Sequence, residues 1–374
     1  MRALCFGLVS YNMTCKVDSF PEEGKTYLIQ DKVESGGGFA YDCSILLASW
    51  GLETYIASVV GGDDYGNKIR KELAQSGVRL EYLETTFDKP TPTAFILVDK
   101  VNGNNTKFDI MPERAYIKKE SWQVEPDYIL GDSNEYHAFL TAINKYPNKD
   151  NFVFAKKDDL ETKELCKYGK YILATLEFAS SVTKLQVDVN NAQSLVNLYN
   201  KLLDKYPRSN IVITLGASGA LYTKDKKINM IKGIDIAASD KSGSSNVFRG
   251  AFVYGVSVGY DIEKCIQIAN IAAGLSVSKF GSKSSIPALN EVLAYYTKKF
   301  GNQNHATPHI QTEQTPEQIP VQTPPVVNNT PSENINVQQN NQATVVQKPV
   351  QPVMGNNLNN PGINPPANNN QWRQ

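Results

Sequence analysis

Short apolar runs alternate with amphipathic segments along the first 300 residues, and this alternation constrains the fold more than any other feature. The runs ALCFGLV (3–9), TYIASVV (54–60), YILATL (171–176) and NIVITLG (210–216) are typical of buried strands. Helical periodicity is found between them, at 41–51, 64–78 and 194–207. Strands that alternate with helices indicate a parallel sheet covered on both faces. We therefore expect an α/β fold with a mostly parallel sheet flanked by helices.

Two stretches depart from this rhythm. Residues 25–35 and 92–112 alternate polar and apolar side chains, and the second does so around a Gly/Asn turn. This pattern is typical of exposed antiparallel strands. We expect a small β-lid, with strands at about 24–34 and 92–111, on the α/β core.

The composition changes at Gly301. About half of residues 301–374 are Asn, Gln or Pro, with few charges or aromatic rings, so this part cannot bury a core. We predict a folded domain at 1–300 and a disordered Asn/Gln/Pro-rich tail at 301–374. Whether the tail is only a flexible appendage, or binds a protein partner or associates with itself, is left open by its sequence.

Charge and cysteine content exclude several classes of function. Lys plus Arg and Asp plus Glu both number 38, which gives no electrostatic reason to expect nucleic acid or a membrane as partner. The five cysteines are scattered without a CxxC pair, and the three histidines have no metal-ligand spacing, so we expect no protein-bound metal. No apolar run approaches the length of a membrane span, and the first residues predict a strand, not a signal peptide. We expect a cytoplasmic protein.

The segment SDKSGSSNVFRGAF (239–252) combines a tight turn with the start of an apolar helix. The first N–H groups of a helix are unpaired and the helix dipole favours negative charge there. The sequence therefore predicts an anion hole at Gly243, Ser244 and Ser245. The residue that follows is an amide, Asn246, where phosphate chemistry would use a carboxylate.

Four ordered motifs resemble the PfkB, or ribokinase-like, carbohydrate kinases over roughly residues 2 to 300. They are GGGFAYDCSILLASWGLETYIASVVGGDDYGNKIRKELAQSGV (36–78), VITLGASGALY (212–222), SDKSGSSNVFRGAF (239–252) and IANIAAGLSVSKFGSKSSIP (268–287). The resemblance implies a ribokinase-like core with a β-lid that pairs subunits in some members. It also implies ATP-dependent phosphorylation of sugars or related alcohols, with Mg-ATP as the nucleotide.

The resemblance also implies site residues. Positions that match the family's sugar pocket are Asn12, Gly37, Gly38 and Asp42, and those that match its nucleotide site are Thr214, Gly216, Gly219, Asn270, Ala273 and Gly281. No N-x-x-E pair, which acts through magnesium in many members, is present; Thr175 and Glu177 occupy its neighbourhood.

The departures from the family pattern fall on the substrate side. Asn246 replaces the aspartate that acts as base, and Ser244 and Ser245 replace small residues of the phosphate loop. Asn12 stands where Asp is usual and Asp42 where Asn is common. Either these two exchange an amide and a carboxylate within one pocket, or both are local caps.

A neutral amide cannot accept a proton at neutral pH, and a positioned base supplies about 10²–10⁴ in rate. We therefore expect a catalytically impaired pseudokinase that binds ATP, a sugar or both, with Asn246 inactive. The alternatives are an active kinase in which Asp240 or Asp42 serves as base, and a scaffold protein that acts through its tail.

Overall fold

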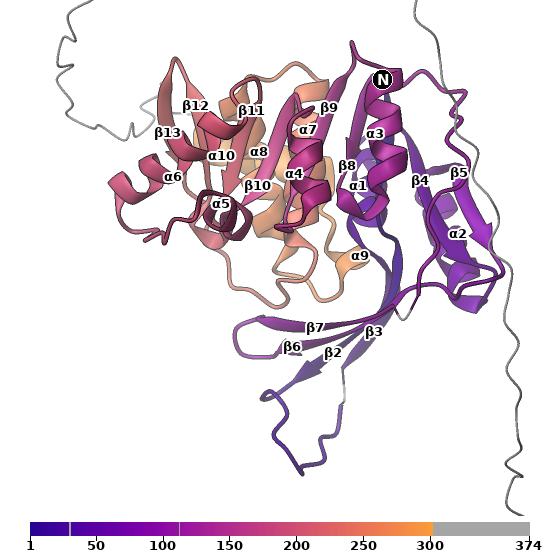
Figure 1. Ribbon diagram of the computed structural model, residues 1–374. Coiled ribbons are helices and arrows are strands. Elements are labelled where there is room, and N and C mark those ends of the chain that lie inside the picture. The colour runs from indigo at the N-terminus through magenta and orange to yellow at the C-terminus, as the bar shows by residue number, and fades with distance from the viewer. Residues whose placement is uncertain (30, 112, 302–374) are drawn as a thin grey trace, which may run out of the picture. The chain divides into compact units, whose positions relative to one another are not determined.

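The computed structural model describes residues 1–29, 31–111 and 113–301 (Figure 1). The predicted disordered tail lies outside the described residues, apart from Gly301.

Among the described residues, nine strands form one large sheet. Its spatial order is β13 (Lys227–Ile231), β12 (Ala220–Lys224), β11 (Asn210–Thr214), β10 (Tyr171–Thr175), β9 (Asp150–Ala155), β8 (Tyr128–Gly131), β1 (Arg2–Phe6), β4 (Glu53–Gly61) and β5 (Arg79–Thr86). The strands from β11 to β5 are all parallel, whereas β12 and β13 join the edge antiparallel. The predicted parallel sheet is confirmed.

Helices cover both faces of this sheet, because alternate residues of its strands point to opposite sides. One face packs against α1 (Phe39–Ser49), α7 (Ser244–Ser257), α8 (Ile262–Ser276) and α10 (Leu289–Phe300). The other packs against α3 (Tyr136–Lys145), α4 (Leu160–Cys166), α5 (Leu176–Thr183) and α6 (Ala192–Lys205). The alternation is clear in β9, where Phe152 and Phe154 belong to the first core and Val153 and Ala155 to the second.

Short elements complete the α/β body. Helix α2 (Asp64–Gln75) packs beside β4 and β5, and its Ile69 and Leu73 join a third buried cluster. The remaining turns of helix are η1 (Ser133–Glu135), η2 (Gly216–Ser218) and α9 (Ser282–Ser285).

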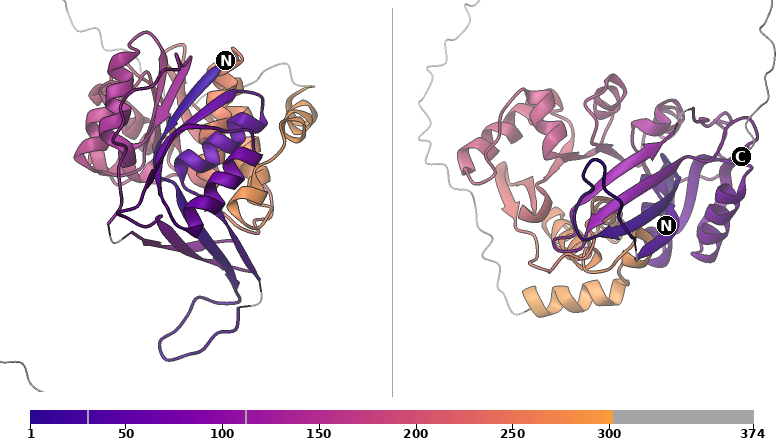
Figure 2. Two further views of the ribbon diagram at one scale, coloured as in Figure 1. Left: turned by 90° about the vertical axis from the view of Figure 1, so that its right-hand side faces the viewer. Right: turned by 90° about the horizontal axis from the view of Figure 1, so that it is seen from below.

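A separate sheet forms the lid. In the part of the chain that the structure describes, it has four strands in the order β3 (Lys32–Gly37), β2 (Ser10–Val17), β6 (Thr93–Asp99) and β7 (Asn105–Ile110). The lid projects from the carboxyl edge of the large sheet, below it in Figure 1 and towards the viewer in the right panel of Figure 2. Strand β1 leads directly into β2, so the first segment of the chain links the two sheets.

The lid differs in two ways from the prediction. The apolar run at 3–9 was expected to be a single strand, but the chain leaves the large sheet after Phe6 and enters the lid at Ser10. Glycine suits this bend for two reasons. Gly7 has a φ of 154°, and Phe39 packs so closely that a Cβ would come within 2.8 Å of its ring. The lid strand expected at about 24–34 begins only at Lys32, while β6 and β7 fall within 92–111.

All five cysteines are buried and unpaired, at positions 5, 15, 43, 166 and 265. Among the described residues, no helix combines the length and hydropathy needed to cross a bilayer.

Candidate functional site

A cavity of about 370 Å³ lies where the lid faces the carboxyl edge of the large sheet. Residues that directly follow strands β8 and β9, the start of α1, the start of α7 and one face of the lid all line it. In α/β proteins, ligands bind at this edge of the sheet. A second depression of about 600 Å³ lies between α1 and α10, but most of the side chains that line it are apolar and cannot act as acids, bases or nucleophiles. The polar cavity is therefore the candidate site.

The cavity brings together most of the residues predicted for the substrate side. Its lining includes Asn12, Gly38, Asp42, Gly243, Ser244, Ser245 and Asn246. Gly37 is not part of the lining but packs against Asn12, since a Cβ at that position would come within 2.1 Å of the Asn12 amide nitrogen.

The start of α7 has the features of a phosphate-binding loop. Gly243 adopts a φ of 77°, which a Ser would adopt only with strain, whereas Ser244 and Ser245 already have helical geometry. The serines that replace smaller residues therefore do not distort the turn. No side chain caps this helix, and among the described residues the backbone N–H groups of Ser244 and Ser245 have no acceptor. These free donors at a helix N-terminus fit an anion.

Asp240 holds this loop in place. Its Oδ1 accepts from Ser242 N at 2.8 Å and its Oδ2 from Gly281 N at 3.0 Å, and the side chain is buried. Both carboxylate oxygens are thus committed to the backbone, and Asp240 is not among the residues that line the cavity. It is a positioning residue for the loop.

Asp42 lies in the first turn of α1 and is 3% exposed. Its Oδ2 accepts a hydrogen bond of 2.8 Å from Asn246 Nδ2, and its Oδ1 is buried with no partner among the described residues. Burial raises the pKa of this carboxyl group to about 7, although the Asn246 hydrogen bond and the charge of Lys107 both lower it. Burial therefore makes this carboxyl group hold its proton more tightly than an exposed aspartate does.

Asn246 is fixed by two neighbours of opposite kind. Its Oδ1 accepts from Arg249 Nη1 at 3.1 Å, while its Nδ2 donates to Asp42. Because a guanidinium only donates and an ionised carboxylate only accepts, the amide has a single orientation. Arg249 is 5% exposed, and its guanidinium carbon lies 5.4 Å from the centroid of the Phe154 ring. Burial lowers the pKa of this guanidinium group.

The amide that contacts Asp42 is thus Asn246 of α7. Asn12 lies on β2 of the lid, where its Oδ1 accepts from Ser10 Oγ at 2.8 Å. Both Asn12 and Asp42 line the cavity, but no hydrogen bond joins them. Neither is a helix cap, since Gly38 occupies the N-cap position of α1.

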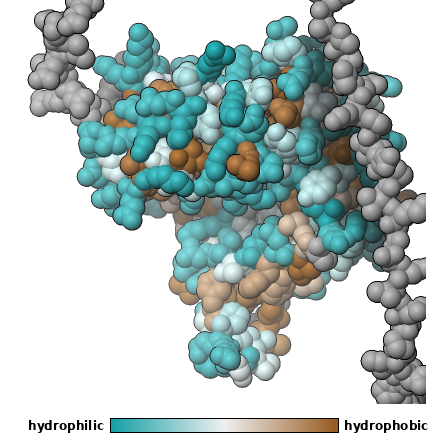
Figure 3. Space-filling view, viewed as in Figure 1, coloured by the Kyte–Doolittle hydropathy of each residue, from teal (hydrophilic) through white to brown (hydrophobic). Residues whose placement is uncertain are grey.

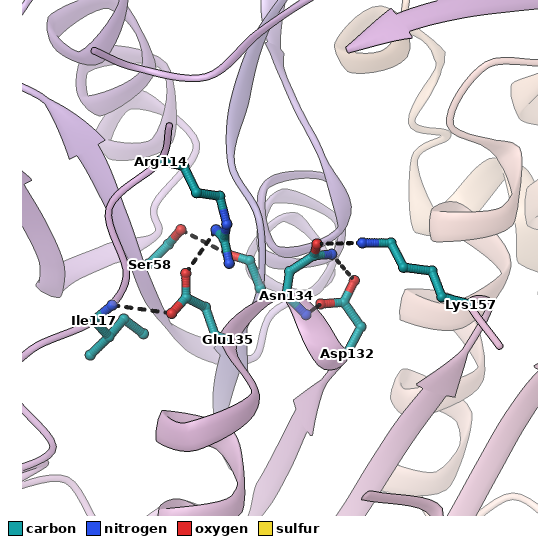
Figure 4. Close-up of polar contacts among 8 residues, drawn as sticks. Ser58, Arg114, Ile117, Asp132, Asn134, Glu135 and Lys157 are labelled. Atoms are coloured by element: carbon teal, nitrogen blue, oxygen red, sulfur yellow. Dashed lines mark hydrogen bonds and ion pairs between the residues drawn. The ribbon is translucent and has the colours of Figure 1, made fainter. Parts of the chain in front are cut away.

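A second polar cluster borders the cavity after β8 (Figure 4). Asp132 accepts from Asn134 N at 2.9 Å and from Asn134 Nδ2 at 2.8 Å, and Asn134 Oδ1 accepts from Lys157 Nζ at 3.0 Å. Behind it, Glu135 pairs with Arg114 at 3.0 Å. Burial raises the pKa of Asp132 and raises that of Glu135 to about 7. Asp132 thus has both oxygens occupied within its own loop.

Cationic side chains surround the cavity. They come from the lid, from the segment after β9, from the loop before α7 and from α7 itself, and they are Lys107, Lys156, Lys157, Lys241 and Arg249. Several positive charges around one polar cavity favour a ligand with phosphate groups.

The residues predicted for the nucleotide lie outside this cavity. Gly216 and Gly219 form the turn between β11 and β12, both with positive φ, and Thr214 ends β11. Asn270 on α8 donates to the carbonyl of Ile231 at 3.3 Å. Ala273 follows it on the same helix and Gly281 precedes α9. Their role in binding the nucleotide stays a prediction.

A metal site of protein ligands is not found among the described residues, since no three His, Cys, Asp or Glu side chains converge. At the position of the absent N-x-x-E pair, Thr175 caps α5 by accepting from Phe178 N at 3.2 Å. Mg²⁺ is often held by substrate phosphates and water with few protein ligands.

Sequence reasoning missed Arg249, Asp132 and the lysines after β9. Arg249 follows Asn246 by three residues inside an apolar helix, a spacing that places both on one helix face. Asp132 and Lys156 directly follow buried strands, and this position in the sequence could have predicted that both lie at the carboxyl edge of the sheet.

Comparisons with known proteins agree with the fold. Residues 2–289 match the description of the pfkB family carbohydrate kinases. The ribokinase of Bacillus subtilis is 27% identical over 307 residues, which are 78% of this chain and 98% of that protein. The nucleoside kinase of Methanothermobacter thermautotrophicus is 23% identical over 314 residues, covering 80% of this chain and 96% of that protein.

Two solved structures have the same architecture. The ribokinase of Thermotoga maritima superposes with a TM-score of 0.65 at 21% identity, covering 79% of this chain and 99% of that chain. The Arabidopsis thaliana ribokinase complexed with ribose and ATP superposes with a TM-score of 0.64 at 18% identity, covering 78% of this chain and 97% of that chain. Together with the match over residues 2–289, the sheet order and the lid-covered cavity lead to one assignment: the chain belongs to the pfkB family of carbohydrate kinases.

Proposed function

We propose that this protein is an active ATP-dependent kinase that phosphorylates a hydroxyl group of a sugar or a related alcohol. One observation carries the proposal: the cavity that contains the uncapped start of α7 also contains a buried carboxylate, Asp42, with a free oxygen. Impaired chemistry was expected because Asn246 cannot accept a proton. The contact between Asn246 and Asp42 supports the active alternative instead.

The residues of the cavity fit the phosphates of a nucleotide. The free N–H groups of Ser244 and Ser245 would hold a phosphate oxygen, and Lys156 and Lys241 also line the cavity, where they would offset its charge. When bound, ATP supplies the phosphoryl group, and magnesium held by its phosphates offsets charge. Phosphoryl transfer needs mainly positioning and charge stabilisation from a protein.

Other lining residues fit an acceptor with several hydroxyl groups. Asn12 and Asp109 of the lid and Asn134 beside β8 present amide and carboxylate groups to the cavity. Such groups give and receive hydrogen bonds with hydroxyls, whereas an apolar ligand would leave them unpaired. The ribokinases and the nucleoside kinase found as relatives carry names that denote ribose-containing acceptors, which supports a ribose-like compound.

A binding protein without turnover is the second candidate. The observation in its favour is the tie between Asn246 and Arg249, which fills the position of the family's base with a neutral group held by a buried cation. Such a protein would bind nucleotide with no increase in ADP release when acceptors are added.

The experiment that separates the two measures ADP release by the purified full chain with Mg-ATP and a panel of pentoses, hexoses and nucleosides. The active kinase gives release that depends on one class of acceptor and yields a phosphorylated product by mass spectrometry. A titration that shows nucleotide binding, with no release above the buffer for any acceptor, supports the binding protein.

Assembly and location are further parts of the proposal. The outer face of the lid is apolar, with Phe108 and Ile110 exposed by 51% and 55%, and brown surface gathers on the lid in Figure 3. A lid-to-lid homodimer would cover it. Five unpaired cysteines support a reducing, cytoplasmic location. A protein partner for the tail stays a prediction outside the described residues.

A further inference from the structure

We propose that Asp42 is the general base of the reaction and that Asn246 orients it, so that the two side chains have exchanged the roles expected of their positions. The inference rests on the proposed kinase function. It assigns the separate roles of base and orienting group to Asp42 and Asn246.

One carboxylate oxygen of Asp42 accepts a hydrogen bond, and the other has no partner among the described residues. Asn246 Nδ2 donates to Oδ2 at 2.8 Å, whereas Oδ1 is buried and meets no donor among the described residues. An unpaired buried carboxylate oxygen is costly. Oδ1 is closed to solvent in the structure, so an acceptor alcohol that enters the cavity has to reach it by a small shift of the site. Its O–H would then be the partner that this oxygen lacks, and it carries the proton that a base must remove.

The other carboxylates near the site are already committed. Both oxygens of Asp132 accept from Asn134, and both oxygens of Asp240 accept from backbone N–H groups. Asp109 on the exposed lid strand β7 pairs with Lys107 at 2.6 Å. Among the described carboxylates that line the cavity, Asp42 alone combines burial with an unoccupied oxygen.

The position of Asp42 suits transfer to the acceptor. A Cβ built on Gly243 would lie 3.6 Å from Asp42 Oδ2, so the carboxylate borders the start of α7 where phosphate would bind. Because both oxygens belong to one carboxyl group, an acceptor hydrogen-bonded to Asp42 would lie beside the same loop. Proximity of this kind is the main demand of phosphoryl transfer.

Asn246 and Arg249 hold the base in its working geometry. Arg249 donates to Asn246 Oδ1, which leaves Nδ2 to face Asp42, so the chain of hydrogen bonds fixes which carboxylate oxygen is used. Burial in this cavity sets the pKa of Asp42 at about 7, near the value that suits a base at neutral pH. The charged groups around the cavity are Lys107, Asp109, Asp132, Lys156, Lys241 and Arg249.

The step balances without a further reactant. Asp42 Oδ1 takes the proton from the acceptor hydroxyl as the oxygen forms its bond to the γ-phosphorus, and the bond between that phosphorus and the bridging oxygen of ADP breaks. The products are the phosphate ester, ADP and a protonated Asp42, which then loses its proton to solvent.

The test compares four full-length proteins with the acceptor found in the screen: wild type, Asp42→Asn, Asn246→Asp, and the double variant Asp42→Asn/Asn246→Asp. Asp42→Asn should lower kcat by about 10²–10⁴ with the Kd for ATP unchanged within threefold. The double variant, which returns the carboxylate to the other member of the pair, should recover at least tenfold over Asp42→Asn. Asp261→Asn, an equal chemical change at the exposed cap of α8, is the control.

The wild-type pH profile gives a second test that does not depend on a variant folding. A base that must be ionised makes kcat/KM rise about tenfold per pH unit below 7 and level off above. In Asp42→Asn this rise should vanish, which a merely structural role for Asp42 would not produce.

Three outcomes overturn the inference. Asp42→Asn with more than a tenth of wild-type kcat shows that the base lies elsewhere while the kinase function stands. Asn246→Asp with at least tenfold higher kcat than wild type shows that the chain lacks a working base at Asp42. Wild type without acceptor-dependent ADP release refutes the kinase function itself, and the base assignment with it.

Discussion

Replacing Asp42 by Asn should change how the stability of the protein depends on pH, whether or not any substrate is known. The carboxyl group has a pKa of 3.8 in the unfolded chain and about 7 in the folded one, because it is buried. Between these values the folded state binds more protons than the unfolded state. The wild type therefore loses stability as pH rises from about 4 to about 7.

The size of the effect follows from the shift. Each pKa unit corresponds to 1.36 kcal/mol, so the wild type should lose about 3 kcal/mol relative to Asp42→Asn between pH 5 and pH 8. The asparagine keeps the shape of the side chain and can still accept from Asn246, which limits other changes. The variant should thus be more stable than the wild type, and the difference in stability should be larger at pH 8 than at pH 5.

Urea unfolding at 25 °C, followed by far-ultraviolet circular dichroism at both pH values, measures this difference. Asp261→Asn serves as the control, since asparagine caps a helix about as well as aspartate and its difference from wild type should stay below about 1 kcal/mol at both pH values. A gap between wild type and Asp42→Asn that is the same at pH 5 and pH 8 would refute the reasoning, because it would mean that burial does not hold the proton on Asp42.

Three further predictions concern the loop, the orienting arginine and the lid. Gly243→Ala should cost about 1–2 kcal/mol of stability, since φ is 77°, and should weaken ATP binding by calorimetry; unchanged values for both would contradict the phosphate loop. Arg249→Met frees the oxygen of Asn246, so kcat at saturating ATP should fall at least tenfold; full activity would show that the amide needs no such anchor. Phe108→Asp should convert a dimer to a monomer in sedimentation velocity, and a wild type that sediments as a monomer would exclude the lid interface.

Much of the fold could be predicted from the sequence, because its signals are local. The apolar runs at 171–176 and 210–216 became β10 and β11, and the Gly/Asn turn in 92–112 joins β6 to β7. The bend after Phe6 was missed, since a continuous apolar run hides the point where one strand ends and another begins. A single glycine with a positive φ marks that point in the structure.

The site was only partly predictable. Both Asp42 and Asn246 stood out in the sequence, but the contact between them spans 204 positions, and no local pattern shows that α1 and α7 pack side by side. The expected exchange of an amide and a carboxylate between Asn12 and Asp42 stays a prediction, and both residues line the same cavity. The raised pKa of Asp42 depends on burial, which appears only in the folded chain.

The most direct test is a crystal structure of the wild-type protein with a non-hydrolysable ATP analogue and the acceptor identified by the screen. Asp42 as base predicts an acceptor hydroxyl within about 2.6–3.2 Å of Asp42 Oδ1, facing the terminal phosphate at the start of α7. An acceptor whose reacting hydroxyl contacts Asp132 or only the Asn246 amide, with Asp42 Oδ1 still unpaired, would contradict it.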